Sequence, residues 1–162
     1  RVVVMSGGAV QQIGTPEEVY RHPATPFVYG FLGAVNFFHG RVEGEGLRVG
    51  DDHLLHAADD FGQGAEVIAF ARPHELDIAV GADANQGIPA RVSRVLSFGV
   101  TARVELDGLN GATGQHFEVE LTRERAAELA LEEGQAVRLL PSRLSIFEQG
   151  HAANAAAAGA RK

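Results

Sequence analysis

The chain has no cysteine among its 162 residues, so disulfide bonds, thiolate metal ligands and cysteine nucleophiles are excluded together. Its only lysine is Lys162, and the phosphate-binding loop Gly-x-x-x-x-Gly-Lys-[Ser/Thr] is therefore absent. The longest run without Asp, Glu, Lys, Arg or His extends from Pro23 to Phe38. Because prolines and glycines interrupt it and it falls short of roughly 18 apolar residues, we expect no transmembrane segment.

Basic residues are also scarce. The sequence has 14 Lys and Arg against 21 Asp and Glu, a net charge of -7, whereas a nucleic-acid binder normally carries a basic surplus. Hydrophobic residues at 45% and charged residues at 22% are typical of a soluble globular domain, and the length allows one such domain with an appendage. The sequence starts at Arg1 rather than at methionine and shows no secretory leader. We expect it to be a piece of a longer parent.

The N-terminal segment predicts a hairpin followed by two short helices. Strand-like residues 2–5 and 9–13 flank a Ser-Gly-Gly turn, whose glycines tolerate positive φ. Thr15 can cap a helix, since a proline follows it and Glu18 completes a capping box. The same Thr-Pro pattern recurs at Thr25, ahead of a second apolar helical face.

From Asn36 onward, short strand-like runs alternate with glycine-rich turns, which is typical of a barrel or sandwich of many short strands. We therefore expect a mainly β fold, a partly closed OB-like barrel of short antiparallel strands, preceded by the hairpin and helices. One helix should interrupt it, from a Thr122 cap to Gly134. The expected strands are 37–43, 46–57, 67–71, 75–80, 88–98, 102–107, 117–121, 136–140 and 143–148.

These patterns divide the chain into three parts. Residues 1–35 hold the hairpin and the two helices, and residues 36–149 hold the β-barrel domain. Residues 150–162 are mostly alanine with nothing large to bury, so we expect this tail to be disordered.

The first candidate site follows the continuously apolar run 67–71, which predicts a strand buried on both faces. In the Arg72-Pro73-His74-Glu75 sequence that comes next, proline ends ladder pairing, and we expect a rigid corner that presents Arg72 and His74 outward. Two interpretations remain open. The corner is either purely structural, or it is a contact point for a partner or a twin subunit.

The second candidate site consists of Ser93, Arg94, Ser97 and Thr101. Their hydroxyls and guanidinium are groups that hold a tetrahedral oxyanion. The alternative is an ordinary pair of strands in which Gly99 marks a bulge.

Other chemistry has little support in the sequence. Residues 51–60 hold two histidines and four carboxylates, but a strand would point His53 and His56 to opposite faces, so we favour a solvated acidic turn over a metal site. No serine lies in a Gly-x-Ser-x-Gly elbow, and His74-Glu75 lacks the second histidine of a zincin. We expect no catalytic residue, no metal and no cofactor in this chain.

A family resemblance adds to this interpretation. Residues 1–20, with their Ser-Gly-Gly turn and Gly-Thr-Pro-Glu-Glu cap, resemble the closing segment of an ATP-binding cassette (ABC) ATPase domain. Residues 21–38 resemble the linker of importer ATPases for sulfate, polyamines, iron and maltose, whose subunits carry a C-terminal regulatory OB-like barrel of the transport-associated (TOBE) type. The sequences at 72–75, 96–99 and 144–147 are similar to strand signatures of that domain. The Asn-Phe-Phe and Arg-Pro-His sequences make the sulfate/thiosulfate importers the most similar.

The resemblance implies a regulatory and dimerisation domain in the ATP-binding subunit of such an importer. That subunit would form a homodimer with its twin, contact transmembrane permease subunits and lie peripherally on the cytoplasmic face of the membrane. The parent would be an ABC-type transport ATPase that binds ATP and Mg²⁺ in an upstream domain, whereas this fragment should not hydrolyse ATP. Two alternatives stay open: an oxyanion-sensing domain that binds sulfate or molybdate, and, last, a nucleic-acid-binding barrel, which the acidic charge opposes.

Overall fold

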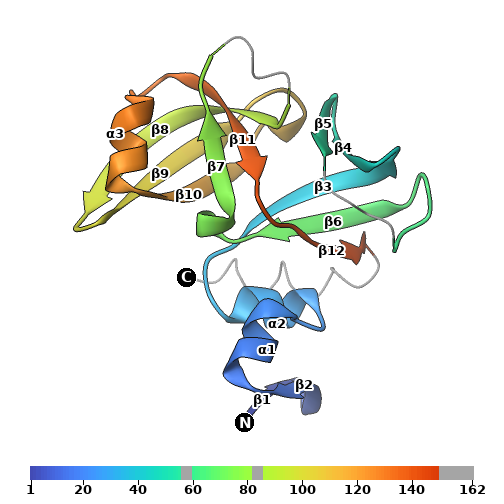
Figure 1. The fold of residues 1–162 in the computed structure, drawn as a ribbon. Helices are drawn as coiled ribbons and strands as arrows, with labels where there is room; N and C mark the ends of the chain where they lie inside the picture. The colour runs from blue at the N-terminus through green and yellow to red at the C-terminus, as the bar shows by residue number, and fades with distance from the viewer. Residues whose placement is uncertain (56–59, 82–85, 150–162) are drawn as a thin grey trace.

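The computed structural model describes residues 1–55, 60–81 and 86–149 (Figure 1). The tail predicted to be disordered lies outside the described residues. The predicted hairpin is confirmed: β1 (Val2–Ser6) pairs antiparallel with β2 (Ala9–Gly14). Its turn needs glycine, because Gly7 and Gly8 have φ of 57° and 80°.

The two predicted helices are confirmed as α1 (Pro16–Arg21) and α2 (Pro26–Phe31). The Thr15 hydroxyl accepts from the Glu18 amide at 3.2 Å while the Glu18 carboxylate accepts from the Thr15 amide at 2.7 Å, so the capping box is complete. At α2 the Thr25 hydroxyl accepts from the Val28 amide at 3.3 Å and caps the helix. None of the helices in the described ranges is long and apolar enough to cross a lipid bilayer.

The first of two five-stranded sheets has the order β12-β6-β3-β4-β5. In the region predicted as one strand over 46–57, the described residues 46–55 form a tight hairpin instead, because Gly50 turns the chain with φ of 61°. Every neighbouring pair in the sheet is antiparallel. The strands are β3 (Asn36–Glu43), β4 (Gly46–Val49), β5 (Asp52–Leu55), β6 (Glu66–Ala71) and β12 (Ser145–Glu148).

The second sheet has the order β10-β9-β8-β11-β7. It curls until its two edge strands, β10 and β7, contact each other without a hydrogen-bonded ladder, so within the described residues the barrel is only partly closed (Figure 1). The mainly β, OB-like prediction is therefore confirmed. The strands are β7 (Leu76–Ala79), β8 (Ile88–Phe98), β9 (Thr101–Gly108), β10 (His116–Thr122) and β11 (Ala136–Pro141).

Helix α3 (Arg123–Leu129) follows β10 directly. The Thr122 hydroxyl caps it at the Arg125 amide, as predicted. The predicted end at Gly134 is wrong, because Ala130 already adopts a left-handed conformation with φ of 46° and stops the helix. Two 3₁₀ turns complete the chain, η1 (Pro73–Glu75) and η2 (Asn110–Ala112).

One hydrophobic core fills the space between the two sheets. Phe38 from β3 stacks on Phe117 from β10 with ring centroids 5.2 Å apart. The buried Asn36 side chain donates to the Glu118 carbonyl and accepts from the Glu118 amide, both at 2.8 Å, and so occupies the open edge of β10. The start of the first sheet thereby satisfies backbone groups of the second.

The two sheets also approach closely at a pair of glycines. A Cβ atom added at Gly111 in η2 would lie 2.6 Å from the Cα of Gly50 in the β4–β5 turn. Gly111 is not among the glycines with positive φ, so a side chain there would meet a steric obstacle and no backbone strain.

We predict that Gly111→Ala lowers the free energy of unfolding by about 1–3 kcal/mol, because the sheets must separate locally to admit the methyl group. Gly62→Ala is the matched control, since a Cβ there meets nothing within 4 Å and φ is again not in the left-handed region. Urea unfolding of both variants provides the measurement. Equal midpoints for Gly111→Ala and the unsubstituted chain would contradict the close approach.

Candidate functional site at the Arg72 junction

The first candidate residue, Arg72, lies at the end of β6, where Pro73 starts the η1 turn. The prediction that it points outward is wrong: it is only 3% exposed. Its guanidinium lies over the ring of Tyr20 from α1 at 4.0 Å and over the ring of Tyr29 from α2 at 4.6 Å. His74, by contrast, is exposed as predicted. The corner therefore holds Arg72 against the two helices and leaves only His74 for solvent.

Glu75 organises the same place. One of its carboxylate oxygens, Oε2, accepts from the Tyr29 hydroxyl at 2.8 Å and from the Arg72 amide at 2.8 Å. Burial and this hydrogen bond to a carboxylate raise the pKa of Tyr29 far above its usual value. We call Tyr20, Tyr29, Arg72 and Glu75 the Arg72 junction.

The Arg72 guanidinium is unusual because no carboxylate among the described residues forms an ion pair with it. Its Nη2 atom is buried and has no hydrogen-bond partner in the described part of the chain. The two aromatic faces are therefore its main electrostatic partners.

An aromatic cluster supports the junction from the sheet side. The Tyr29 ring contacts Phe70 of β6 with centroids 5.6 Å apart, and Phe70 in turn contacts Phe147 of β12 at 5.7 Å and Phe37 of β3 at 6.4 Å. These rings cover the face of the first sheet that is turned away from the common core. The cluster fixes the position of α2 on that sheet.

The second candidate group lies elsewhere, on the β8–β9 hairpin. Ser93 is the extra residue of a bulge in β8, whereas Gly99, with φ of 59°, forms the hairpin turn. The bulge therefore lies at Ser93 and not at Gly99, where it was predicted. Arg94 and Ser97 are exposed, and the Thr101 hydroxyl donates to the backbone carbonyl of Phe98 at 3.3 Å. No described hydrogen bond or ion pair connects this group to Arg72. The structure thus separates the two candidate sites.

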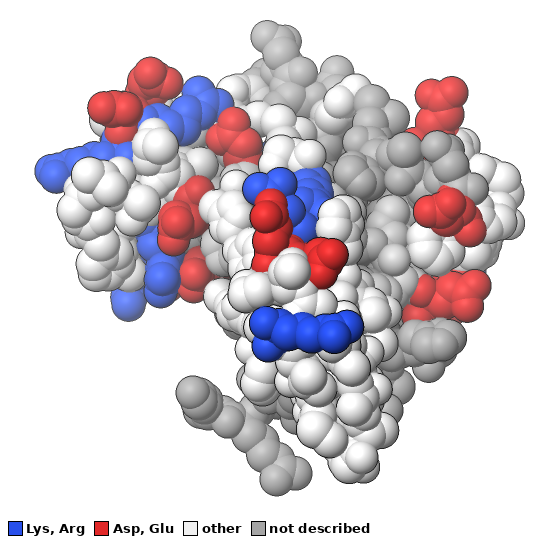
Figure 2. All heavy atoms as spheres, turned by 60° about the horizontal axis from the view of Figure 1, so that its bottom comes forward, with Lys and Arg blue, Asp and Glu red and all other residues white. Residues whose placement is uncertain are grey.

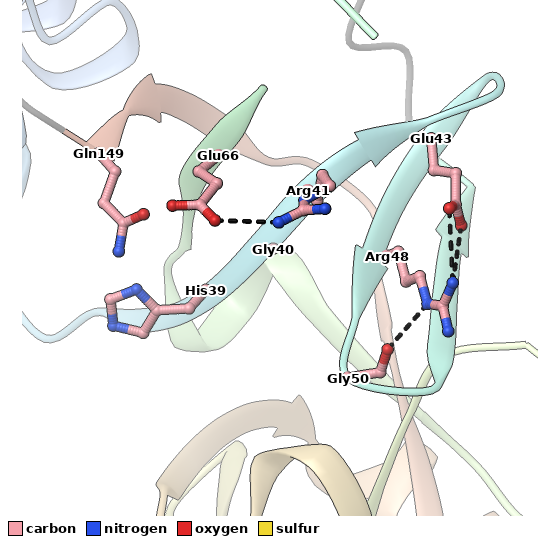
Figure 3. A pocket seen from close by; sticks show the side chains of 8 residues that line it. All are labelled: His39, Gly40, Arg41, Glu43, Arg48, Gly50, Glu66 and Gln149. Carbon is pink, nitrogen blue, oxygen red and sulfur yellow. Dashed lines mark hydrogen bonds and ion pairs between the residues drawn. The ribbon is translucent and has the colours of Figure 1, made fainter. Parts of the chain in front are cut away.

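A pocket of about 410 Å³ was not predicted from the sequence (Figure 3). It lies over β3 and β4, where Arg41 pairs with Glu66 at 3.0 Å and Arg48 pairs with Glu43 at 3.4 Å. The alternation of residues 39, 41 and 43 along one strand face was the signal that could have indicated it. Its lining residues are His39, Gly40, Arg41, Glu43, Arg48, Gly50, Glu66 and Gln149.

The acidic segment 51–60 shows ion pairs where the sequence offered a metal site as an alternative. Asp52 accepts from Arg138 at 2.9 Å and His53 lies 3.3 Å from Glu43. His56 and residues 57–59 lie outside the described residues. Among those that are described, no group of three or more His, Asp or Glu side chains is arranged to hold a metal ion.

Comparison with known proteins shows which families the sequence matches. Residues 36–78 match the family described as the CysA C-terminal regulatory domain, and residues 82–142 match the TOBE-like domain family. The matched residues, 36–78 and 82–142, therefore form a regulatory domain of the CysA and TOBE-like type. The recognition made from residues 1–38 and from the strand signatures is thereby confirmed.

Curated relatives carry the name sulfate/thiosulfate import ATP-binding protein CysA. That of Ralstonia nicotianae is 42% identical over 97% of this chain and 43% of its own length. That of Chromobacterium violaceum is 45% identical over 91% of this chain and 40% of its own length. The chain therefore spans about two-fifths of the relatives it matches.

A solved structure has a similar fold. The cytoplasmic molybdate-binding protein ModG, with molybdate bound, superposes with a TM-score of 0.52 at 20% identity, over 70% of this chain and 95% of that chain. At this identity the likeness shows the fold of the CysA-type domain alone.

The raised pKa of Tyr29 yields a prediction for the CysA-type domain. In a Tyr20→Phe variant, where Tyr29 is the only tyrosine, the phenol should stay protonated through an alkaline absorbance titration until the chain unfolds. Since the folded pKa is raised, stability is unaffected below about pH 10 and falls as the pH rises further, because only the unfolded state ionises there. Tyr29→Phe should remove this slope and cost about 1 kcal/mol for the lost hydrogen bond. Titration of Tyr29 near its ordinary pKa in the folded chain would contradict the burial.

Proposed function

We propose that the chain is the regulatory and dimerisation part of the ATP-binding subunit of a sulfate/thiosulfate importer. The observation that carries the proposal is the 42% identity over 97% of the chain to the Ralstonia nicotianae protein. Binding of ATP and Mg²⁺ belongs, in this proposal, to the part of the relatives that this chain does not match. The subunit would pair with its twin and with permease subunits, peripherally on the cytoplasmic face of the membrane.

The charge distribution on one face of the molecule bears on the nucleic-acid alternative. Figure 2 shows acidic and basic side chains interspersed on the face that includes the helices, and the described residues of that face form no continuous basic track. A nucleic-acid-binding barrel needs such a track with stacking aromatics, so this face gives that alternative no support.

A chimeric subunit tests the transport role. We expect that the matching region of the Ralstonia nicotianae protein can be replaced by residues 1–149 with retention of sulfate uptake, in a host that lacks its own sulfate importer. The control is the same chimera with Gly62→Ala, which changes a residue with open space around it. A chimera that assembles and hydrolyses ATP but imports no sulfate would contradict the proposal.

Equilibrium sedimentation tests dimerisation. We expect the average mass to rise above 17.2 kDa with increasing protein concentration. Pairing in the intact subunit should be tighter, because the second contact becomes intramolecular. A mass that stays at 17.2 kDa for the chain and at the monomer mass for the chimera, at every concentration, would remove the dimerisation half of the proposal.

Oxyanion sensing is the second candidate, because the ModG structure that shares the fold is described with molybdate bound. For a sensor, calorimetry should give saturable heat with sulfate or molybdate and none with chloride at the same ionic strength. Arg94→Gln and Ser97→Ala should weaken that binding. Arg41→Gln, which changes the pocket over β3, should leave it unchanged if the hairpin is the binding site. If neither oxyanion gives heat, the sensing role is contradicted and the interface role is the one that remains.

A further inference from the structure

Helix α2 lies between two separate cores. Val28 packs with Val4 and Val19 in a small core that joins α2 to α1 and the β1–β2 hairpin. Tyr29, the next residue, packs against Ile68 and Phe70 of the first sheet. We call residues 1–21 the N-terminal unit. This unit is connected to the sheets through the six-residue helix α2 and through direct contacts of α1.

The described contacts of α1 with the sheet side are few. Tyr20 lies on the Arg72 guanidinium at 4.0 Å, and Arg143 donates to the carbonyl of Arg21 through an exposed side chain. Gln12 fixes the helix–helix linker by bonding the His22 carbonyl and the Ala24 amide, both at 2.9 Å, but this bond lies within the N-terminal segment. The Tyr20–Arg72 contact thus joins a side chain of α1 directly to a buried side chain at the β6 corner.

The two rings around Arg72 differ in burial. Tyr29 is 2% exposed and is held by Glu75, whereas Tyr20 is 39% exposed. A cation over an aromatic ring is held modestly, and a buried guanidinium without a carboxylate gains hydration when it is uncovered. If Tyr20 moves away, Nη2 of Arg72, which has no partner among the described residues, can bond to water. Opening therefore has a compensation that an ordinary buried contact lacks.

We propose that the Tyr20–Arg72 contact is a releasable link that sets the angle between the N-terminal unit and the two sheets. Arg72 is a positioning residue: a shift at the β6–η1 corner passes through it to α1. Its use as a regulatory relay rests on the function proposed above, whereas the link itself is a property of this chain.

The absence of cysteine makes a distance measurement direct. Spin labels at Glu17→Cys on α1 and Asp51→Cys in the β4–β5 turn, side chains that are 74% and 93% exposed, report the angle. The unsubstituted junction should give one narrow distance distribution. Arg72→Met and Tyr20→Leu should broaden it or add a second distance, while Tyr20→Phe, which keeps the ring, should restore the narrow form.

Intrinsic emission supplies a second readout. The chain has two tyrosines and no tryptophan, and both tyrosines contact Arg72. In a Tyr29→Phe background, acrylamide quenching of Tyr20 should rise about twofold when Arg72→Met is added, as the ring goes from 39% exposed toward full exposure. Arg41→Met, which changes an exposed arginine on β3, is the matched control and should leave both readouts unchanged.

The outcomes separate this link from the proposed function. A distance distribution that stays narrow and unshifted in the folded Arg72→Met variant overturns the link. If Arg72→Met does not fold, the same result in Tyr20→Leu overturns it. Failure of the chimera to import sulfate with the distance changes present overturns the proposed function and leaves the link standing.

Discussion

Strand β6 buries both of its faces, and the rest of the structure depends on this. Val67, Ala69 and Ala71 face the core between the two sheets, while Ile68 and Phe70 face the aromatic cluster that receives Tyr29. A strand that is buried on both faces is held by close-packed neighbours on each side, so a displacement on one side is passed to the other. Arg72 follows directly, so the junction inherits its place from a strand that is fixed on two sides.

The features that were predicted correctly are those that depend on residues close together in the sequence. The continuous apolar run 67–71 indicated burial on both faces, and the Thr15 and Thr25 caps defined the two helices. These features depend on residues a few positions apart. The prediction of a single strand over 46–57 was wrong because a glycine such as Gly50 is compatible with a strand as well as with a turn. The turn is fixed by the approach of Gly50 to Gly111 in the other sheet, which the local sequence does not show.

The orientation of Arg72 was not accessible from the sequence. Arginine before proline at the end of a strand is usually exposed, and the alternative needs partners that the pattern cannot supply. Tyr20 and Tyr29 come from two helices far away in the chain, and the Glu75 side chain that would be the expected ion-pair partner instead accepts from Tyr29 and from the backbone. The placement of the serine group has a different cause: the bulge at Ser93 and the turn at Gly99 place it on an exposed hairpin, away from Arg72.

Fold likeness and site chemistry therefore lead to different conclusions here. The sheets resemble those of a molybdate-binding protein, but a shared fold at 20% identity carries no ligand groups with it. Among the described residues, the guanidinium of Arg72 is buried without a carboxylate as an ion-pair partner. It is placed against helices that precede the matched regions at residues 36–78 and 82–142. A cation in that position can respond to small displacements of the sheets, because its two rings belong to helices and its backbone belongs to the β6 corner. Regulation through such a contact needs a change in packing at one residue and no ligand pocket in the sheets themselves.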